Sequence, residues 1–471
     1  MPYPNCSALP VVLLSLALAN IAAAQDTAPA PSADPKAPAP KHFLITDYGA
    51  KADGTTLNSA AIQKTIDTAA TAGGGVVEIP KGTFLSGSIF LKQGVELFLD
   101  DGAVLLGSQN ISDYPKQTTR IEGHFQPWRM ALVNVQNMDH VRIGGPGQLN
   151  GNGAPYWAAF RSAPRGTTNL DVERPRLMFV DHCADVRIED IALQDSGFWN
   201  IHLYHCHDVL LQNLRINAPA GSPSTDGVDV DSCQNITIRK CEISNNDDDI
   251  ALKGSKGPFA DKDTDSPPVE NILIEDCTFG SGNGVLTCGS EATIVRNVTV
   301  RNCVINGGAN LLTLKLRPDT PQHYSNITID GITATGAGRF LNVAPWTQYF
   351  DLQGQPSPAR VIDHVTVRNV TGSFRLLGSL RGTVGDSISN ITLENINLAV
   401  PTTNFTLGPT ENVTLKNFAV NGAWYQLPTS GPAAALPKAR APATPATTAP
   451  AAAPAVPATP AAAAPTTATS T

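Results

Sequence analysis

The chain has 471 residues, a formal net charge of −8 and 16% charged residues. An acidic total argues against nucleic acid as a partner, whereas an acidic sugar could still bind at a local basic patch. No stretch approaches the roughly twenty apolar residues of a membrane span, so we expect no membrane-embedded part.

The two ends of the chain are low in complexity. Residues 1–24 are typical of a secretory signal peptide, because Val11–Ala19 is apolar apart from Ser15 and small residues precede Gln25. We therefore expect a secreted protein, extracellular or periplasmic, although no Lys or Arg precedes the apolar run. Residues 25–41 form a Pro/Ala-rich linker and residues 427–471 an Ala/Pro/Thr-rich tail. Both bury too little apolar surface to offset the entropy of ordering, and we expect them to be disordered.

A short helix is predicted at residues 58–72, before the repeats begin. Ala61, Ile62 and Ile66 fall on one side of it, three glycines at 73–75 end it, and residues 76–80 begin a strand. Such a helix would cap the first rung of a solenoid.

A repeated pattern runs from about residue 135 to residue 420. Each copy has an Asx or His, then an apolar residue, then alternating β-branched residues, and the gaps between copies are 45, 23, 27, 36, 26, 29, 38, 26 and 22 residues. A unit of 22–29 residues with insertions indicates a solenoid made of strands. We therefore predict an all-β parallel β-helix over residues 42–426, with strands stacked about 4.8 Å apart. The first apolar residues of the copies are Val141, Val186, Val209, Ile236, Ile272, Val298, Ile327, Val365, Ile391 and Val413.

Side chains at a constant offset from these markers should stack from rung to rung. For the cysteines we favour stacked thiols over disulfides, because side chains in register point the same way. The repeated Asn-Ile/Val-Thr matches the glycosylation sequon, but an Asn ladder at a turn explains a fixed rung position better. The same holds for His182 and His205, which we interpret as a ladder and not as a metal site. The stacked cysteines are Cys183, Cys206 and Cys233 in one group and Cys241, Cys277 and Cys303 in the other.

Carboxylates cluster in two segments about one rung apart, at residues 224–231 and 246–251. Asp226 and Asp247 are 21 residues apart, and Asn283 shares the column of Asp247. Lys315 and Arg317 follow on the next rung and project to one face. Carboxylates stacked this closely raise one another's pKa, as a general acid with an ionised neighbour requires. A calcium-binding or solvated turn is the alternative.

With these motifs the chain resembles glycoside hydrolase family 28, the polygalacturonase family of right-handed, pectin-lyase-like parallel β-helices. The resemblance runs from about Phe43 to Val420. It implies that Asp247 is the general acid and that Asp226 and Asp248 hold and deprotonate the attacking water. The matching segments are residues 75–82 (the entry segment), 196–202 (Ser-Pro-x-Trp), 224–227 (Asn-Thr-Asp) and 246–248 (Gly-Asp-Asp).

The resemblance also implies a reaction. We expect an inverting hydrolase of α-glycosidic bonds in a pectic polysaccharide, acting as a monomer without a metal or other cofactor. An inverting pair stands about 6.5–9.5 Å apart, so the side chains of adjacent rungs would have to splay.

Two departures from the family pattern bear on substrate choice. Asn283 stands where the family has His, and Thr313 stands where it has Arg. We therefore keep a rhamnogalacturonan-type hydrolase and a non-catalytic polysaccharide-binding β-helix as alternatives. A calcium-dependent pectate lyase is a further alternative, because it shares the β-helix fold. The predicted substrate contacts are Asn283, Lys315, Arg317 and Lys253; surface lysines on an inserted loop are the plainer interpretation of Lys253 and Lys256.

Overall fold

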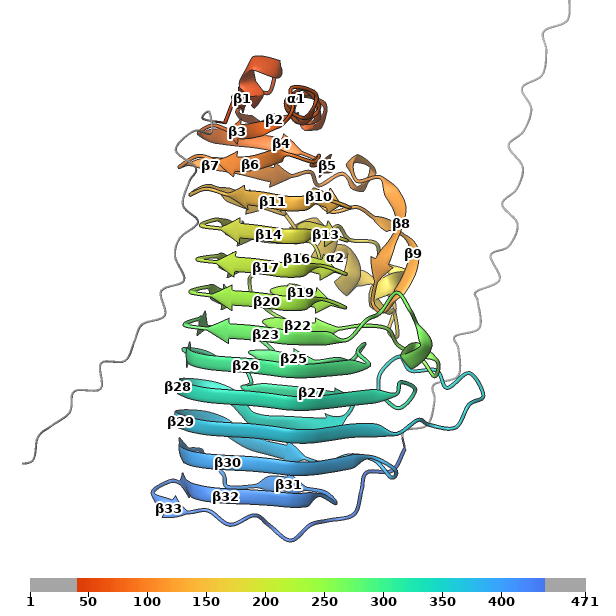
Figure 1. Ribbon diagram of the computed structural model, residues 1–471, viewed down its shortest axis with the longest axis vertical. Coiled ribbons are helices and arrows are strands. Elements are labelled where there is room, and N and C mark those ends of the chain that lie inside the picture. The colour runs from red at the N-terminus through yellow and green to blue at the C-terminus, as the bar shows by residue number, and fades with distance from the viewer. Residues whose placement is uncertain (1–39, 437–471) are drawn as a thin grey trace, which may run out of the picture. The chain divides into compact units, whose positions relative to one another are not determined.

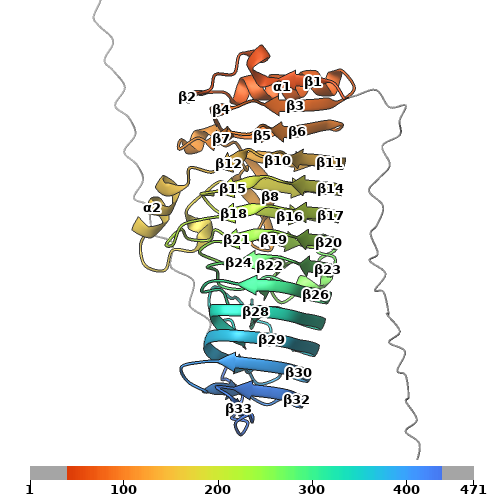
Figure 2. The same ribbon diagram turned by 90° about the vertical axis from the view of Figure 1, so that its left-hand side faces the viewer.

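The computed structural model describes residues 40–436, so the predicted signal peptide and most of the predicted linker and tail lie outside the described residues. The described strands wind into a parallel β-helix, in which each full turn adds a strand, or a part of a longer strand, to each of three columns (Figure 1 and Figure 2). The predicted fold class is confirmed.

The strands fall into columns by their pairing. The first column, which carries the site, contains β5 (Ile89–Phe90), β10 (Val133–Gln136), β13 (Met178–Asp181), β16 (Ile201–Tyr204), β19 (Val228–Asp231), β22 (Ile250–Lys253), β25 (Leu286–Cys288), β27 (Leu312–Leu316) and β31 (Phe405–Leu407). The second contains β1 (His42–Leu44), β3 (Gly75–Ile79), β6 (Val95–Leu99), β11 (Asp139–Gly144), β14 (Ala184–Glu189), β17 (His207–Gln212), β20 (Gln234–Arg239), β23 (Val269–Glu275), β26 (Ile294–Ile305), β28 (Gln322–Pro345), β29 (Arg360–Leu380), β30 (Ser387–Ala399) and β32 (Glu411–Val420). The third contains β2 (Asp53–Leu57), β4 (Gly82–Ser86), β7 (Ala103–Gly107), β12 (Gln148–Asn150), β15 (Ala192–Gln194), β18 (Arg215–Asn217), β21 (Glu242–Ser244) and β24 (Thr278–Phe279).

The longer strands bend from one column into another. The C-terminal parts of β28 and β29 continue the first column, because β27 pairs with β28 and β29 pairs with β31. Outside the columns lie the antiparallel hairpin of β8 (Lys116–Ile121) and β9 (His124–Arg129), the short β33 (Ala423–Trp424) and the helix α2 (Ala154–Ser162). The 3-10 turns are η1 (Ile45–Tyr48), η2 (Ile111–Asp113), η3 (Asn169–Asp171) and η4 (Ala260–Lys262).

The predicted register is confirmed for every pair of markers. Val186 pairs with Val209, and Ile272 pairs with Val298, as their spacing predicts. The remaining markers pair in the same way, including those separated by insertions. The reason is that each marker is a core residue, so a slip by one residue would turn the whole strand inside out.

The ladders of stacked side chains are also present. Asn271 has φ +60°, a conformation that Asn tolerates at a turn, and its Nδ2 donates to Asn235 Oδ1 at 3.0 Å. Asn297 repeats the contact with Asn271. The described cysteines are free and buried, so stacked thiols and not disulfides occupy the two Cys columns. The rings of His182 and His205 stack with centroids 4.4 Å apart.

The N-terminal helix α1 (Ser59–Thr71) lies at the first turns of the β-helix (Figure 1). Ile62, Ile66 and Ala69 are buried, and Gly74 N–H donates to the Ala69 carbonyl where the helix ends. This helix shields core residues that the first rung would otherwise expose.

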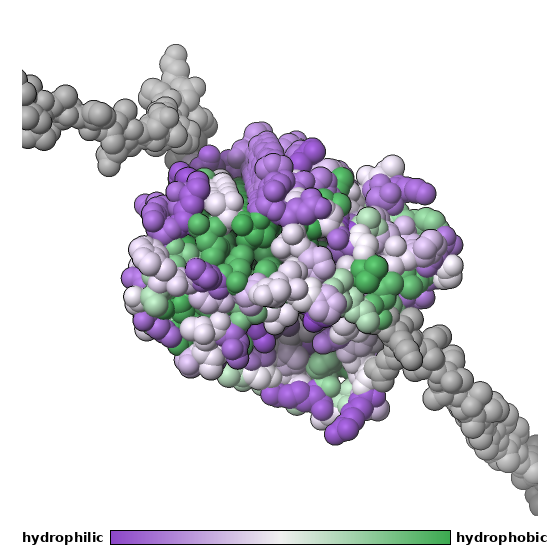
Figure 3. Space-filling view, turned by 90° about the horizontal axis from the view of Figure 1, so that it is seen from below, coloured by the Kyte–Doolittle hydropathy of each residue, from purple (hydrophilic) through white to green (hydrophobic). Residues whose placement is uncertain are grey.

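The opposite end is covered less completely. Trp424 and Val384 are exposed by 75% and 69%, and Figure 3, which views the unit from that end, shows apolar surface among polar residues. Residues 427–436, which begin the predicted disordered tail, pair with the last turns instead: Gly431 N–H donates to the Leu407 carbonyl and Ala434 N–H to that of Gly382. These hydrogen bonds use backbone carbonyls at the edge of the last turns, where a sheet offers unpaired groups to a neighbouring segment.

Candidate active site

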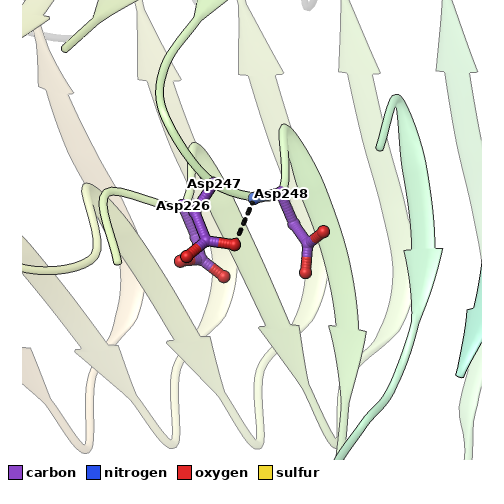
Figure 4. Close-up of side chains that lie close together, drawn as sticks. All are labelled: Asp226, Asp247 and Asp248. Carbon is purple, nitrogen blue, oxygen red and sulfur yellow. Dashed lines mark hydrogen bonds between the residues drawn. The ribbon is translucent and has the colours of Figure 1, made fainter. Parts of the chain in front are cut away.

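A pocket of about 430 Å³ lies on the outer face of the first column, where β19 and β22 begin. Asp226, Asp247 and Asp248 line it. One carboxylate oxygen from each lies within 4.8 Å of one from each of the others, and Figure 4 shows the three side chains extending to the same side of the sheet.

The register of two neighbouring rungs brings the carboxylates together. Val228 pairs with Ile250, and Gly227 N–H donates to the Asp248 carbonyl at 2.9 Å. Asp226 is therefore in register with Asp248 on the next rung. Asp247, 21 residues after Asp226, precedes the exact partner by one residue. Asp248 in turn bridges to Gly284 on the following rung.

Asp247 is half-buried and is held by the next rung. Its Oδ1 accepts hydrogen bonds from Asp248 N–H at 3.0 Å and from Asn283 Nδ2 at 3.1 Å. Asn283 N–H also donates to the Asp247 carbonyl at 2.7 Å. Asn283 thus shares the column of Asp247, as predicted, and orients its carboxyl group with an amide.

Asp248 is buried and has two side-chain partners. Lys315 Nζ, on β27, donates to its Oδ2 at 2.6 Å, and Thr287 Oγ1 donates to its Oδ1 at 2.9 Å. Lys315 Nζ also lies 4.8 Å from the ring centroid of Trp346. Lys315, which we predicted as a substrate contact, therefore also forms an ion pair with Asp248 within the protein.

Lys253 ends β22 and is buried, so the interpretation as a surface lysine on an inserted loop is wrong for it. Its Nζ lies 3.4 Å from Asp229 Oδ1, 3.6 Å from Asp226 Oδ2 and 3.9 Å from Glu291 Oε2. Burial would lower the pKa of Lys253, but the charges of Asp229 and Asp226 outweigh it and raise the pKa well above its usual value.

Arg317 lines the pocket from the loop after β27, and its guanidinium is buried. Its Nε donates to Asp319 Oδ1 at 2.7 Å, and its Nη1 lies 3.6 Å from Glu291 Oε1. Glu291 therefore faces several cations. Although burial acts in the opposite direction, Lys253, Lys256 and Arg317 hold the pKa of Glu291 well below its usual range.

Two of the three clustered carboxyls favour their protonated forms. Burial, followed by the charges of Asp247 and Asp229, raises the pKa of Asp226 well above its usual value. Burial and the charge of Asp248 raise the pKa of Asp247, against smaller opposing effects from Lys315 and Asn283. The cluster can thus supply a proton without the histidine that Asn283 replaces.

Three clustered carboxylates can also be ligands of a metal ion. Among residues 40–436, Asp226, Asp247 and Asp248 form the one group of potential ligands close enough to share an ion. However, the ammonium groups of Lys253 and Lys315 contact Asp226 and Asp248, so two of the three ligands already have a counter-ion. The donor set fits a proton-transfer site better than a cation site.

Several pocket residues were not predicted. Trp346 and Tyr349 come from the insertion between β28 and β29, Glu122 from the tip of the β8–β9 hairpin, and Glu291 from the turn after β25. Insertions have no register, so the repeat could not place them. Trp199 lies in the segment 196–202 that matched a family motif, which was the available signal.

Asp249 completes the acidic triplet but points away from the pocket. Both of its oxygens are buried without a hydrogen-bond partner, and a Cβ at Gly282 would collide with its carboxyl group. Burial, followed by the charges of Asp248 and Asp247, raises the pKa of Asp249 well above its usual value. Burial without a cation or a hydrogen-bond donor therefore favours the neutral form of this carboxyl.

We expect Asp249→Asn to stabilise the protein at neutral pH. The folded-state pKa is raised, so the stability associated with the neutral carboxyl is fully present below the unfolded pKa near 4 and is lost as the pH rises, by at most about 1.4 kcal/mol per pH unit. Asparagine has no such loss. Urea unfolding of both proteins at several pH values between about 4 and 7 should give a difference that grows with pH; a difference independent of pH would contradict the assignment.

A parallel β-helix with a protonatable carboxyl and an ion-paired carboxylate in one cleft has the chemistry of a glycoside hydrolase. The sequence profile of glycosyl hydrolases family 28 matches residues 75–420. The chain belongs to this family and is a glycoside hydrolase.

Two similar proteins are named as polygalacturonases. A probable polygalacturonase of Vitis vinifera is 27% identical over 371 residues, which cover 75% of this chain and 73% of the relative. An endo-polygalacturonase of Pectobacterium carotovorum subsp. carotovorum is 25% identical over 397 residues, 81% of this chain and 92% of the relative.

Solved structures share the fold. The exopolygalacturonase of Thermotoga maritima superposes with a TM-score of 0.71 at 24% identity, covering 82% of this chain and 94% of that structure. In the part of the chain that the structure describes, no helix is long and apolar enough to cross a membrane.

Proposed function

We propose that this enzyme hydrolyses α-glycosidic bonds of galacturonate residues in a pectic polysaccharide. The observation that carries the proposal is the pairing of a protonatable carboxyl, Asp247, with the carboxylate of Asp248, which Lys315 contacts at 2.6 Å. The polygalacturonase names of the relatives support the substrate class.

In the proposed reaction Asp247 gives its proton to the glycosidic oxygen as the bond to the anomeric carbon breaks. A water molecule held between Asp226 and Asp248 adds to that carbon, and its proton passes to the carboxylate of Asp248, which is paired with Lys315. The products are a shortened chain and a new reducing end. Asn283 orients Asp247 through its amide, and Lys315 and Thr287 orient Asp248.

The close spacing of the carboxylates bears on the stereochemistry. The side chains do not splay to the 6.5–9.5 Å or so of most inverting pairs, since their nearest oxygens lie within 4.8 Å. We nevertheless propose inversion. In both schemes the attacking group, a water or a carboxylate, reaches the anomeric carbon from the face opposite the acid. The common direction of the three side chains (Figure 4) therefore does not distinguish inversion from retention, and the anomer formed first does.

The basic residues of the pocket suit an anionic sugar but already have partners. Lys253, Lys315 and Arg317 contact Asp or Glu carboxylates, and Lys256 Nζ lies 3.6 Å from Glu122 Oε2. A galacturonate carboxyl therefore has to share a cation with the protein. This observation favours a rhamnogalacturonan-type substrate as the second candidate, because half of its backbone sugars are neutral. Export from the cell and a monomeric state are proposed with the same function.

A panel of pectic polymers tests the proposal. We expect new reducing ends from polygalacturonate, unchanged by EDTA and without the ultraviolet absorbance of an unsaturated product. Cleavage of rhamnogalacturonan alone would select the second candidate. Absorbance that chelation abolishes would mean a calcium-dependent lyase, and binding without any new reducing ends would mean a non-catalytic protein.

A further inference from the structure

The first column is covered on one side of the carboxylates and accessible on the other. Along β16 the residues Ile201 and Leu203 face the core, so His202 and Tyr204 face outward, yet both are fully buried. On β27 and the end of β28 the outward residues Lys315 and Asn342 are partly exposed. The groove along this column is therefore closed towards the N-terminal turns.

The β8–β9 hairpin covers the closed side. Figure 1 shows it running along the stack, across the turns instead of within them. The ring of Phe125 packs edge-on against Tyr204, with centroids 5.6 Å apart, and Trp128 packs against Phe198 at 6.1 Å.

Buried charges fix the hairpin in this position. Arg120 Nε donates to Asp231 Oδ2 at 3.0 Å, and both side chains are about 1% exposed. Burial alone would raise the pKa of Asp231, but Arg120 and His202 hold it well below its usual range. Arg176 Nη1 donates to the Arg120 carbonyl at 2.9 Å. Removing one member of such a network leaves a charge buried without a partner, which is strongly destabilising. These contacts therefore hold the hairpin against the first column.

The tip of the hairpin ends at the catalytic pocket. Glu122 lines the pocket and its Oε2 lies 3.6 Å from Lys256 Nζ. Gly123 has φ +76°, and a Cβ there would come within 3.0 Å of the Gly254 carbonyl oxygen and 3.1 Å of Lys256 N. The tip is thus pressed against the loop that follows β22, the strand that starts just after Asp248.

A second contact spans the pocket. Tyr349 lies in the insertion between β28 and β29, and its hydroxyl donates to the Thr167 carbonyl at 3.4 Å, in the segment between α2 and η3. Arg317 donates to the Tyr349 carbonyl from within the pocket. Phe160 of α2 and Tyr349 both line the pocket. The contact between these two segments therefore narrows the pocket entrance on the side of α2.

We infer that the enzyme removes sugars from a chain end and does not cut within the chain, with Glu122 and Lys256 meeting the terminal sugar. This rests on the proposed function. A continuous polymer would have to pass through the hairpin, whereas a chain end entering from the open side stops at its tip. There Glu122 can accept a hydrogen bond from a hydroxyl of the terminal sugar, and Lys256 can donate one.

The products of polygalacturonate hydrolysis test the inference. We expect one short product from the earliest time points and a viscosity that falls slowly for each bond cleaved. A ladder of intermediate oligosaccharides with a rapid early loss of viscosity would overturn the inference while leaving hydrolysis intact. No new reducing ends from any pectic polymer would overturn the proposed function itself.

A variant tests the part assigned to the tip. We expect Glu122→Ala to raise KM for short oligogalacturonides about tenfold or more, with the cooperative unfolding transition retained. Glu270→Ala is the matched control, because Glu270 is ion-paired to Arg296 on the exposed face of β23. A KM for the Glu122 variant equal to that of the control would show that the terminal sugar does not reach the tip.

Discussion

Replacing Asp247 with asparagine is expected to lower turnover by about 10²–10⁴-fold, the usual contribution of a general acid. The amide has the same shape and can keep the contact with Asn283, but it has no proton to give to the leaving oxygen. Initial rates on polygalacturonate, together with a thermal unfolding curve, measure both parts of the expectation. A folded variant that keeps most of its activity would remove Asp247 from the acid role.

Asp249→Asn is the matched control for this experiment. It makes the same chemical change two residues away in the same acidic triplet, on a side chain that does not line the pocket. We expect its activity to stay near that of the unaltered enzyme.

Lys315→Met is expected to lower both stability and turnover. Methionine fills much of the same space but leaves the Asp248 carboxylate buried without the ammonium that lies 2.6 Å away. Breaking a buried pair in this way costs about 3–5 kcal/mol. Urea unfolding measures the first effect, and kcat on polygalacturonate measures the second, because Asp248 loses the group that fixes its position and charge.

The control is Lys416→Met on the exposed edge of β32, which should change stability by less than about 0.5 kcal/mol. A rise in KM alone, with kcat and stability unchanged, would make Lys315 a substrate contact and contradict its pairing with Asp248.

Sequence periodicity predicted the rungs well because core packing enforces it. Each marker from Val141 to Val413 pairs with the next, since a shift of one residue would expose the core face of a strand. Asn283 was placed correctly beside Asp247 by the same register.

The residues between the rungs were harder to place. Asp226 and Asp247 do come from adjacent rungs, but the exact partner of Asp226 is Asp248, because Val228 pairs with Ile250 at an offset of 22 residues and not 21. The sequence did not show that Lys253 is buried. The carboxylates that compensate its charge, Asp229 and Glu291, come from other strands and turns, so no local pattern indicated them. The β8–β9 hairpin lies outside the repeat altogether, and its tertiary contacts through Arg120 and Trp128 leave no periodic signal in the sequence.

The first-formed anomer of the product tests the central claim most directly. If Asp247 protonates the leaving oxygen while a water held by Asp226 and Asp248 attacks, proton NMR of polygalacturonate hydrolysis should show the β-anomer first, followed by slow mutarotation. EDTA should not change this result. An α-anomer formed first would mean that a carboxylate, and not water, attacks the sugar, and would contradict the assignment of the three aspartates.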